Sequence, residues 1–173
     1  MLAVWTSGLN KQLRFPPQES TKRSSRKRCP RRKTNLNSDG EALVLNASAI
    51  VDLLLDVPTA AAIQQRMRGN ELHAPAHFDA EVLSVLGRLH RDGHLSSSDV
   101  STRLTLVERL PIQRHELPSL LTGAWDRRGN LRLVDALYVE LAERLEAQIL
   151  TTDEHLAATV TRAEIPANGR TGQ

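Results

Sequence analysis

Short apolar runs alternate with longer amphipathic segments along residues 41–173. Four runs predict strands: 42–45 (ALVL), 72–75 (LHAP), 110–115 (LPIQRH) and 148–151 (QILT). Between them, apolar residues recur at helical spacing and predict helices over 49–55, 58–67, 78–90, 96–108, 117–128 and 133–145. Strands that alternate with helices form parallel sheets covered on both faces. We therefore expect a three-layer α/β fold with a central parallel sheet of four or five strands.

Polar and helix-breaking residues mark the ends of several predicted helices. Ser48 stands where a capping residue would begin the first helix, and Pro58 suits the first turn of the second. Gly69-Asn70 ends that second helix, and Ser96 can cap the fourth. These signals place tight turns between the strands and the helices.

Charge divides the chain into unlike parts. Residues 1–40 carry ten Lys and Arg against two Asp and Glu, whereas the rest of the chain carries 13 against 18. Because residues 1–40 lack apolar periodicity, we expect a disordered and dispensable basic leader, then a globular domain over 41–160 and a tail over 161–173. The leader is either an arm for nucleic acid or an upstream extension from a mistaken start codon. We favour the second interpretation.

Cellular location and redox chemistry follow from what the sequence lacks. No apolar stretch is long enough for a secretory signal or a membrane span, so we expect a cytoplasmic protein without membrane contact. Cys29 is the single cysteine, which excludes an internal disulfide. His73 and His77 have the spacing of a zinc pair, but Pro75 between them breaks the helix that such a pair needs, and we do not expect zinc.

Four polar residues follow apolar segments or begin helical ones, namely Asn46, Glu81, Asp135 and Asp153. If 42–45 and 148–151 are neighbouring parallel strands, Asn46 and Asp153 lie at the carboxyl edge of the sheet, where open α/β sheets place their active sites. Carboxylates gathered there would repel one another, and a hard divalent cation such as Mg²⁺ relieves that repulsion. The pattern predicts metal-dependent chemistry, with one acid changed to an amide.

The chain resembles the PIN-domain ribonucleases, and among them the toxins of bacterial VapBC toxin–antitoxin pairs (the VapC family). Five stretches in the family's order carry the resemblance, namely LVLNASAIVDLLL, LHAPAHFDAEVLSVLGRL, LPIQRHELPSLLTGAW, NLRLVDALYVELAERL and ILTTDEHLA. They span nearly all of residues 42–158. The leader has no counterpart, because these toxins typically begin at the first strand, and this supports the interpretation of a mistaken start.

The resemblance assigns roles to the four residues. The family's first Asp falls on Asn46, its helix-opening Glu on Glu81, and the Asp residues of its DALYV and TTD motifs on Asp135 and Asp153. It implies a PIN-like fold and an endoribonuclease that uses Mg²⁺ or Mn²⁺ to hydrolyse RNA. It also implies a cognate VapB-type antitoxin that sends a basic side chain into the acidic pocket, and a homodimer.

Asn46 departs from the family pattern. Its amide oxygen can approach a metal but brings no charge, so metal affinity should fall and activity would be reduced or abolished. The substitution is an engineered inactivation, a natural loss of function, or a variant with weak activity. The alternative function is a non-catalytic PIN-fold module that binds an antitoxin or RNA. Residues 41–173 contain neither the lysine of a phosphoacceptor domain nor a glycine-rich phosphate loop.

Other polar residues near the predicted site have two interpretations each. Ser48 is a helix cap or a donor to a neighbouring site residue, and Thr151 and Thr152 either bond a carboxylate or phosphate or simply end a strand. Arg132, with Arg127 and Arg128, either holds RNA phosphates or belongs to a solvated helix end. For Asp79 we favour a helix-capping role over that of an additional acid in the site.

Overall fold

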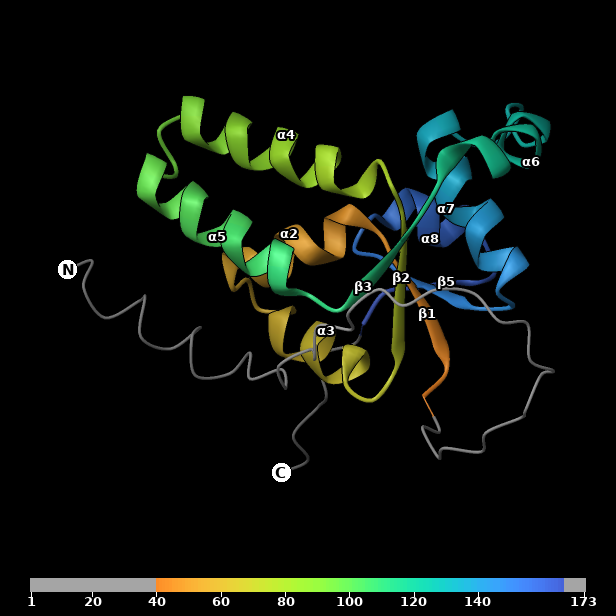
Figure 1. Cartoon of the computed structure of the whole chain (residues 1–173), viewed down its shortest axis with the longest axis horizontal. Helices are drawn as coiled ribbons and strands as arrows, with labels where there is room; N and C mark the ends of the chain where they lie inside the picture. The colour runs from red at the N-terminus through yellow and green to blue at the C-terminus, as the bar shows by residue number, and fades with distance from the viewer. Residues whose placement is uncertain (1–39, 167–173) are drawn as a thin grey trace, which may run out of the picture. The chain divides into compact units, whose positions relative to one another are not determined.

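The computed structural model describes residues 40–166, and its centre is a parallel sheet (Figure 1). The predicted leader, apart from Gly40, and residues 167–173 lie outside the described residues. Five strands form the sheet in the order β3-β2-β1-β4-β5. Their bounds are β1 Ala42–Leu45, β2 Glu71–Pro75, β3 Ile112–His115, β4 Gln148–Leu150 and β5 Ala163–Glu164. The predicted three-layer α/β class is confirmed.

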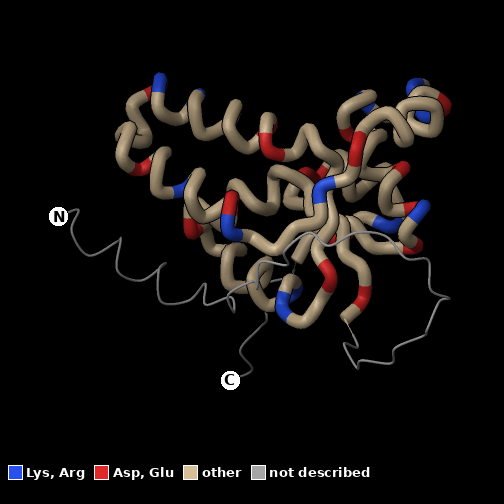
Figure 2. Tube along the Cα trace, in the orientation of Figure 1, with Lys and Arg blue, Asp and Glu red and all other residues tan. Residues whose placement is uncertain are grey.

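Helices cover both faces of this sheet. In Figure 1, α2 to α5 lie to the left of the sheet and α6 and α7 to its right, and α7 contacts β1, β2 and β4. The bounds are α2 Ala47–Leu55, α3 Ala60–Met67, α4 Phe78–Arg91, α5 Ser97–Arg109, the 3₁₀ helix η1 Leu117–Ser119, α6 Leu121–Asp126, α7 Leu133–Arg144 and α8 Glu154–Thr159. Figure 2 shows acidic and basic positions interspersed along these elements.

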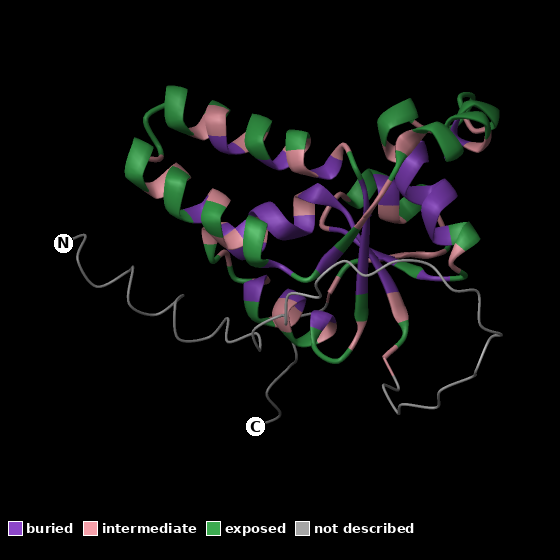
Figure 3. Ribbon diagram, viewed as in Figure 1, coloured by how far each residue is buried: buried purple, intermediate pink, exposed green. Residues whose placement is uncertain are grey.

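The core explains why β1 reads as an unbroken apolar run. Leu43, Val44 and Leu45 are each fully buried, because helices pack on both faces of a central parallel strand. In Figure 3 buried residues follow the strands and the sheet-facing sides of α2 and α7. Tyr138 and Phe78 are among the largest fully buried side chains and belong to the hydrophobic core.

The helix ends differ from expectation at two places. Asn46, rather than Ser48, caps α2, because its side-chain oxygen accepts a hydrogen bond from the backbone N–H of Ser48 at 3.0 Å. The helix predicted over 117–128 is divided into η1 and α6. Pro118 lies at the start of η1 and lacks the N–H that would continue a regular ladder.

Two short elements near the C-terminal end were not predicted. They are α8, which Asp153 caps, and β5, which lies within the segment expected to be a tail. Both are too short for a periodic apolar pattern, so only the tertiary structure reveals them. Within residues 40–166, none of the helices has the length and apolar character that a membrane span requires.

Candidate active site at the carboxyl edge of the sheet

The strand order has a switch point between β1 and β4. The chain proceeds from β1 to β2 and β3 on one side and then returns to β4 on the other. Leu45 of β1 pairs with Leu150 of β4, and the backbone N–H of Asn46 donates to the carbonyl of Leu150 at 3.0 Å. The predicted neighbouring strands are therefore confirmed. In open α/β sheets, ligands bind outside the carboxyl ends of the strands at such a switch point.

Hydrogen bonds join the segments that follow the carboxyl ends of β1 and β4. The hydroxyl groups of Ser48 and Thr151 lie 3.1 Å apart, and the backbone N–H of Thr152 donates to Ser48 Oγ at 3.0 Å. Thr151 Oγ1 also accepts from the backbone N–H of Asp153 at 3.0 Å. Ser48 and Thr151 thus hold the two loops together and orient Asp153. Ser48 therefore contacts a neighbouring loop rather than capping α2, and the hydroxyl of Thr151 bonds Ser48 and a backbone N–H rather than a carboxylate.

Asp135 and Asp153 come from different elements and face the same guanidinium group. Asp135 lies in the first turn of α7, and Asp153 caps α8 by accepting from the N–H groups of His155 and Leu156. Arg132 Nε lies 3.2 Å from Asp135 Oδ2, and Arg132 Nη2 lies 3.4 Å from Asp153 Oδ2. Arg132 therefore bridges the two carboxylates rather than standing free at a solvated helix end.

Burial changes the acidity of Asp135. The partly buried setting of its carboxyl raises its pKa, which the guanidinium of Arg132 opposes and the neighbouring charge of Asp153 reinforces. A carboxyl that is costly to ionise gains from a cation placed against it. A nearby positive charge therefore stabilises the ionised form of Asp135, and Arg132 supplies part of that charge.

Glu81 reaches the site from the first turns of α4 and is fixed by α7. The hydroxyl of Tyr138 donates to Glu81 Oε2 at 2.5 Å, and His77 Nε2 lies 3.4 Å from the same oxygen. Burial and the bond to this carboxylate raise the pKa of Tyr138, so the phenol stays protonated as a donor. Tyr138 was missed in the sequence. It lies three residues after Asp135 on α7, and that spacing on one helix face was the available signal.

His77 is the second residue that sequence reasoning missed here. Its ring contacts Tyr138 edge-on at 4.9 Å between centroids, and neither of its buried ring nitrogens has a hydrogen-bond partner within bonding geometry. Burial lowers its pKa, although Glu81 and Asp135 both act in the opposite direction, so both carboxylates lie near the ring. His73 is elsewhere, with Nδ1 at 3.1 Å from Nε2 of His115. His73 and His77 therefore have different neighbours and do not face a common site.

Arg127 and Asp79 do not have the roles that the sequence suggested, and Arg128 contacts an aromatic ring. Arg127 forms ion pairs with Glu140 and Glu143, so it belongs to a packed α6–α7 contact and not to a free phosphate-binding group. Arg128 stacks on Trp125 at 4.9 Å from the ring centroid. The favoured capping role of Asp79 is wrong, because its carboxylate pairs with Arg114 at 2.9 Å and 3.0 Å.

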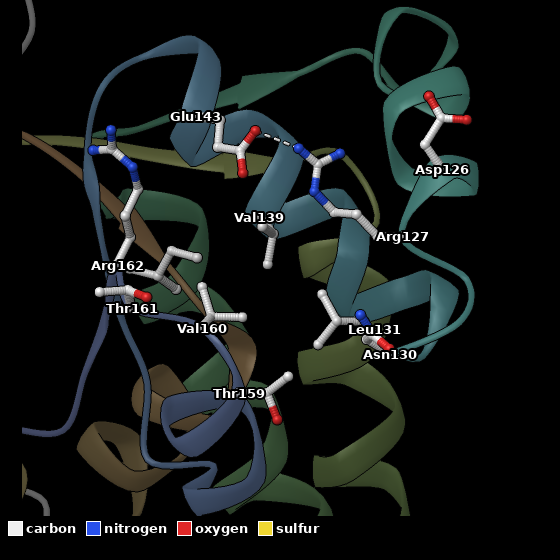
Figure 4. Close-up of a pocket in the computed structure, with 11 residues that line it drawn as sticks. Asp126, Arg127, Asn130, Leu131, Val139, Glu143, Thr159, Val160, Thr161 and Arg162 are labelled. Atoms are coloured by element: carbon white, nitrogen blue, oxygen red, sulfur yellow. Dashed lines mark hydrogen bonds and ion pairs between the residues drawn. The ribbon is translucent and has the colours of Figure 1, made fainter.

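A pocket near the far end of α7 is separate from these residues. It has a volume of about 430 Å³, is lined by Arg127, Glu143 and Arg162 among others, and contains the Arg127–Glu143 ion pair (Figure 4). None of the four residues assigned by the resemblance lines it. The side chains of Glu81, Asp135 and Asp153 are 32%, 15% and 29% exposed, so the acidic edge is accessible to solvent outside this pocket.

The donor set of the acidic edge suits a hard divalent cation. Glu81, Asp135 and Asp153 offer carboxylate oxygens and Asn46 offers an amide oxygen, which are the ligand types of Mg²⁺ and Mn²⁺. As the side chains stand, no three His, Cys, Asp or Glu groups within residues 40–166 are arranged closely enough to hold a metal ion. The residues fit the cation by chemistry, and binding would require side-chain movement, above all of Arg132.

Comparison with known proteins gives a consistent assignment. A family model described as PIN domain matches residues 43–161. The chain is 52% identical over 121 residues to Ribonuclease VapC3 of Mycobacterium tuberculosis, which covers 69% of this chain and 88% of that protein. It is 36% identical over 115 residues to Ribonuclease VapC12 of the same organism, which covers 66% of this chain and 89% of the relative.

Solved structures show the same fold. The crystal structure of PAE2754 from Pyrobaculum aerophilum aligns with a TM-score of 0.54 at 24% sequence identity, over 77% of this chain and 91% of that one. The family model covers more than half of the sequence, and the VapC relatives are matched over most of their length. The chain therefore belongs to the PIN-domain family and, within it, to the VapC group.

Proposed function

We propose that this protein is a divalent-metal-dependent endoribonuclease of a toxin–antitoxin pair. The observation that carries the proposal is the group of acids at the β1/β4 switch point, in a chain 52% identical to a protein named Ribonuclease VapC3. Asp135 and Asp153 share one cationic partner, and Glu81 is oriented toward the same edge by Tyr138. The substrate would be the phosphodiester backbone of RNA.

The chemistry follows from the charges of the site. Hydrolysis of an anionic diester builds up further negative charge, and a divalent cation bound by these acids would neutralise it and lower the pKa of an attacking water. Asp135 and Asp153 would be the main ligands, because both lie at the open edge. Glu81 would be held by Tyr138 in a fixed orientation, so that little rotational freedom is lost when the site assembles.

Asn46 favours a second candidate function, a PIN-fold module with weak or no cleavage. It is 6% exposed, and its side-chain oxygen already accepts from the Ser48 N–H as the cap of α2. An aspartate can make the same capping bond and adds a negative charge near the helix amino end, where it is favoured. The amide therefore preserves the fold and removes one charge from the cation site, so we expect reduced cleavage by this chain.

A charge-restoring variant tests both candidates. Asn46→Asp should increase Mg²⁺- or Mn²⁺-dependent cleavage of RNA, and Asp135→Asn in that background should remove it. The matched control is Asn70→Asp, because Asn70 also accepts a backbone N–H bond, from Glu41, but lies before β2 at the opposite edge of the sheet. If Asn46→Asp and Asn70→Asp cleave no faster than the parent chain while binding metal equally well, position 46 is not a metal ligand and the binding-module function is preferred.

The partner we propose is a VapB-type antitoxin that inserts a basic side chain at the acidic edge. A guanidinium group there would form charge-assisted hydrogen bonds with the carboxylates that would otherwise bind metal. We also propose a homodimer, because Leu121, Trp125 and Leu133 are 55%, 56% and 46% exposed on α6 and α7. Light scattering on the isolated protein tests the dimer, and a monomer with Trp125→Glu but a dimer without it would place the interface.

A further inference from the structure

Arg132 occupies an unusual position for an exposed arginine. It precedes α7 in an extended conformation, makes no capping bond to that helix, and its side chain is 71% exposed. Its guanidinium nevertheless faces two carboxylates from different elements, Asp135 of α7 and Asp153 before α8, at 3.2 Å and 3.4 Å. These are two of the residues that the proposed function assigns to the cation.

His77 and His155 also act to lower the pKa of Asp135, whereas the other polar and charged neighbours are engaged elsewhere. Glu81 is satisfied by the neutral hydroxyl of Tyr138. Arg127 is held by Glu140 and Glu143, and Arg128 lies over Trp125. Within residues 40–166, Arg132 is therefore the arginine that pairs with Asp135 and Asp153. A guanidinium between two carboxylates and a divalent cation bound by them answer the same electrostatic need.

We propose that Arg132 is a built-in counter-ion of the cation site, which stabilises the metal-free protein by bridging Asp135 and Asp153 and must turn away when a divalent cation binds. The inference rests on the proposed function. Its physical basis is that one highly exposed arginine forms two ion pairs, at 3.2 Å and 3.4 Å, because such a side chain can return to water at small cost. The consequence is that metal affinity is set in part by competition within the chain.

The competition should be measurable as a change in metal affinity. Arg132→Gln keeps a long polar side chain but removes the charge, so the carboxylates would no longer have to release a guanidinium. We expect Mn²⁺, titrated into the full chain by calorimetry at low ionic strength, to bind roughly three- to tenfold more tightly, since two exposed ion pairs each contribute little. The matched control is Arg128→Gln. Arg128 lies four positions before Arg132 and carries the same charge, but it contacts Trp125 rather than either carboxylate.

The metal-free protein provides a second measurement. Arg132→Gln should lower its melting temperature by about 1–4 °C in the presence of a chelator, whereas the same change in an Asp135→Asn, Asp153→Asn background should have almost no effect. A structural role of Arg132 unrelated to these carboxylates would give the same loss in both backgrounds. The loss in the first background alone shows that Arg132 acts as their counter-ion.

The outcomes separate this inference from the function on which it rests. Tighter Mn²⁺ binding by Arg132→Gln than by Arg128→Gln supports the counter-ion. Equal affinities in the parent chain and both variants, or weaker binding by Arg132→Gln, overturn it and leave the metal site standing. If none of the three proteins binds Mn²⁺, the proposed metal-dependent function fails, and the competition fails with it.

Discussion

Replacing Tyr138 with Phe isolates one hydrogen bond of the candidate site. The side chain is fully buried, and its hydroxyl donates to Glu81 Oε2 at 2.5 Å. The Phe ring can retain the apolar packing and the edge contact with His77. The substitution therefore removes a donor to a carboxylate with little loss of packed volume.

The expected cost follows from the exposure of the acceptor. A hydrogen bond to a charged group contributes about 1.5–3 kcal/mol to stability. The side chain of Glu81 is 32% exposed, so water can solvate the carboxylate once the phenol is gone. We therefore expect the lower end of that range, about 1.5–2 kcal/mol, as a loss in the free energy of unfolding.

Urea denaturation of Tyr138→Phe, Glu81→Gln and the double variant measures this contribution as a cycle. The coupling between the two positions should be about 1 kcal/mol, because a neutral amide accepts a weaker bond than a carboxylate. In the Asn46→Asp background, Tyr138→Phe should also lower kcat for RNA cleavage and leave KM nearly unchanged, since the orientation of Glu81 is lost. A stability loss under about 0.5 kcal/mol with no coupling would falsify the view that Tyr138 fixes Glu81.

Gly123→Ala should lower the free energy of unfolding by about 1–3 kcal/mol, because an added Cβ would lie 2.0 Å from the carboxylate of Glu140, which cannot move away without breaking its ion pairs with Arg127 and Arg144. Thermal melts should show no comparable loss of stability for Gly129→Ala, where an added Cβ would have no contact within 4 Å. Equal losses of stability in the two variants would contradict the packing argument. His115→Gln should flatten the acid dependence of stability. Burial lowers the pKa of His73 and His115, so the stability of the neutral pair is present above the ordinary pKa of 6.5 and is lost as pH falls through the lowered values. Urea midpoints measured at about pH 7.5 and pH 5 test this. The same difference between the two midpoints in the parent chain and in His115→Gln would refute it. Asn46→Asp should melt lower than the parent chain in chelator, because repulsion from the neighbouring acids outweighs the favourable charge at the amino end of α2, and higher in Mn²⁺, which removes that repulsion. Shifts of the same sign in both conditions would exclude position 46 from the cation site.

The sequence by itself determined four of the five strands, most of the longer helices and the edge at which the polar residues gather. The run at 42–45 is apolar at every position because both faces of β1 are covered, and this allowed the strand and its neighbours to be predicted. Since parallel strands share one carboxyl edge, the positions of Asn46 and Asp153 followed from the strand assignments. Secondary structure depends mainly on residues that are close in the sequence, so the order of apolar and polar residues is enough to predict it.

Tertiary structure alone decided how the side chains meet at that edge. Tyr138 and Glu81 are 57 residues apart, and their hydrogen bond exists only because α7 packs beside the start of α4. The position of Arg132 between Asp135 and Asp153 likewise depends on how α7 and the turn before α8 approach each other. The sequence does not show which residue a charged side chain will pair with, because ion pairs and hydrogen bonds depend on distances of a few ångström that only the packed chain sets.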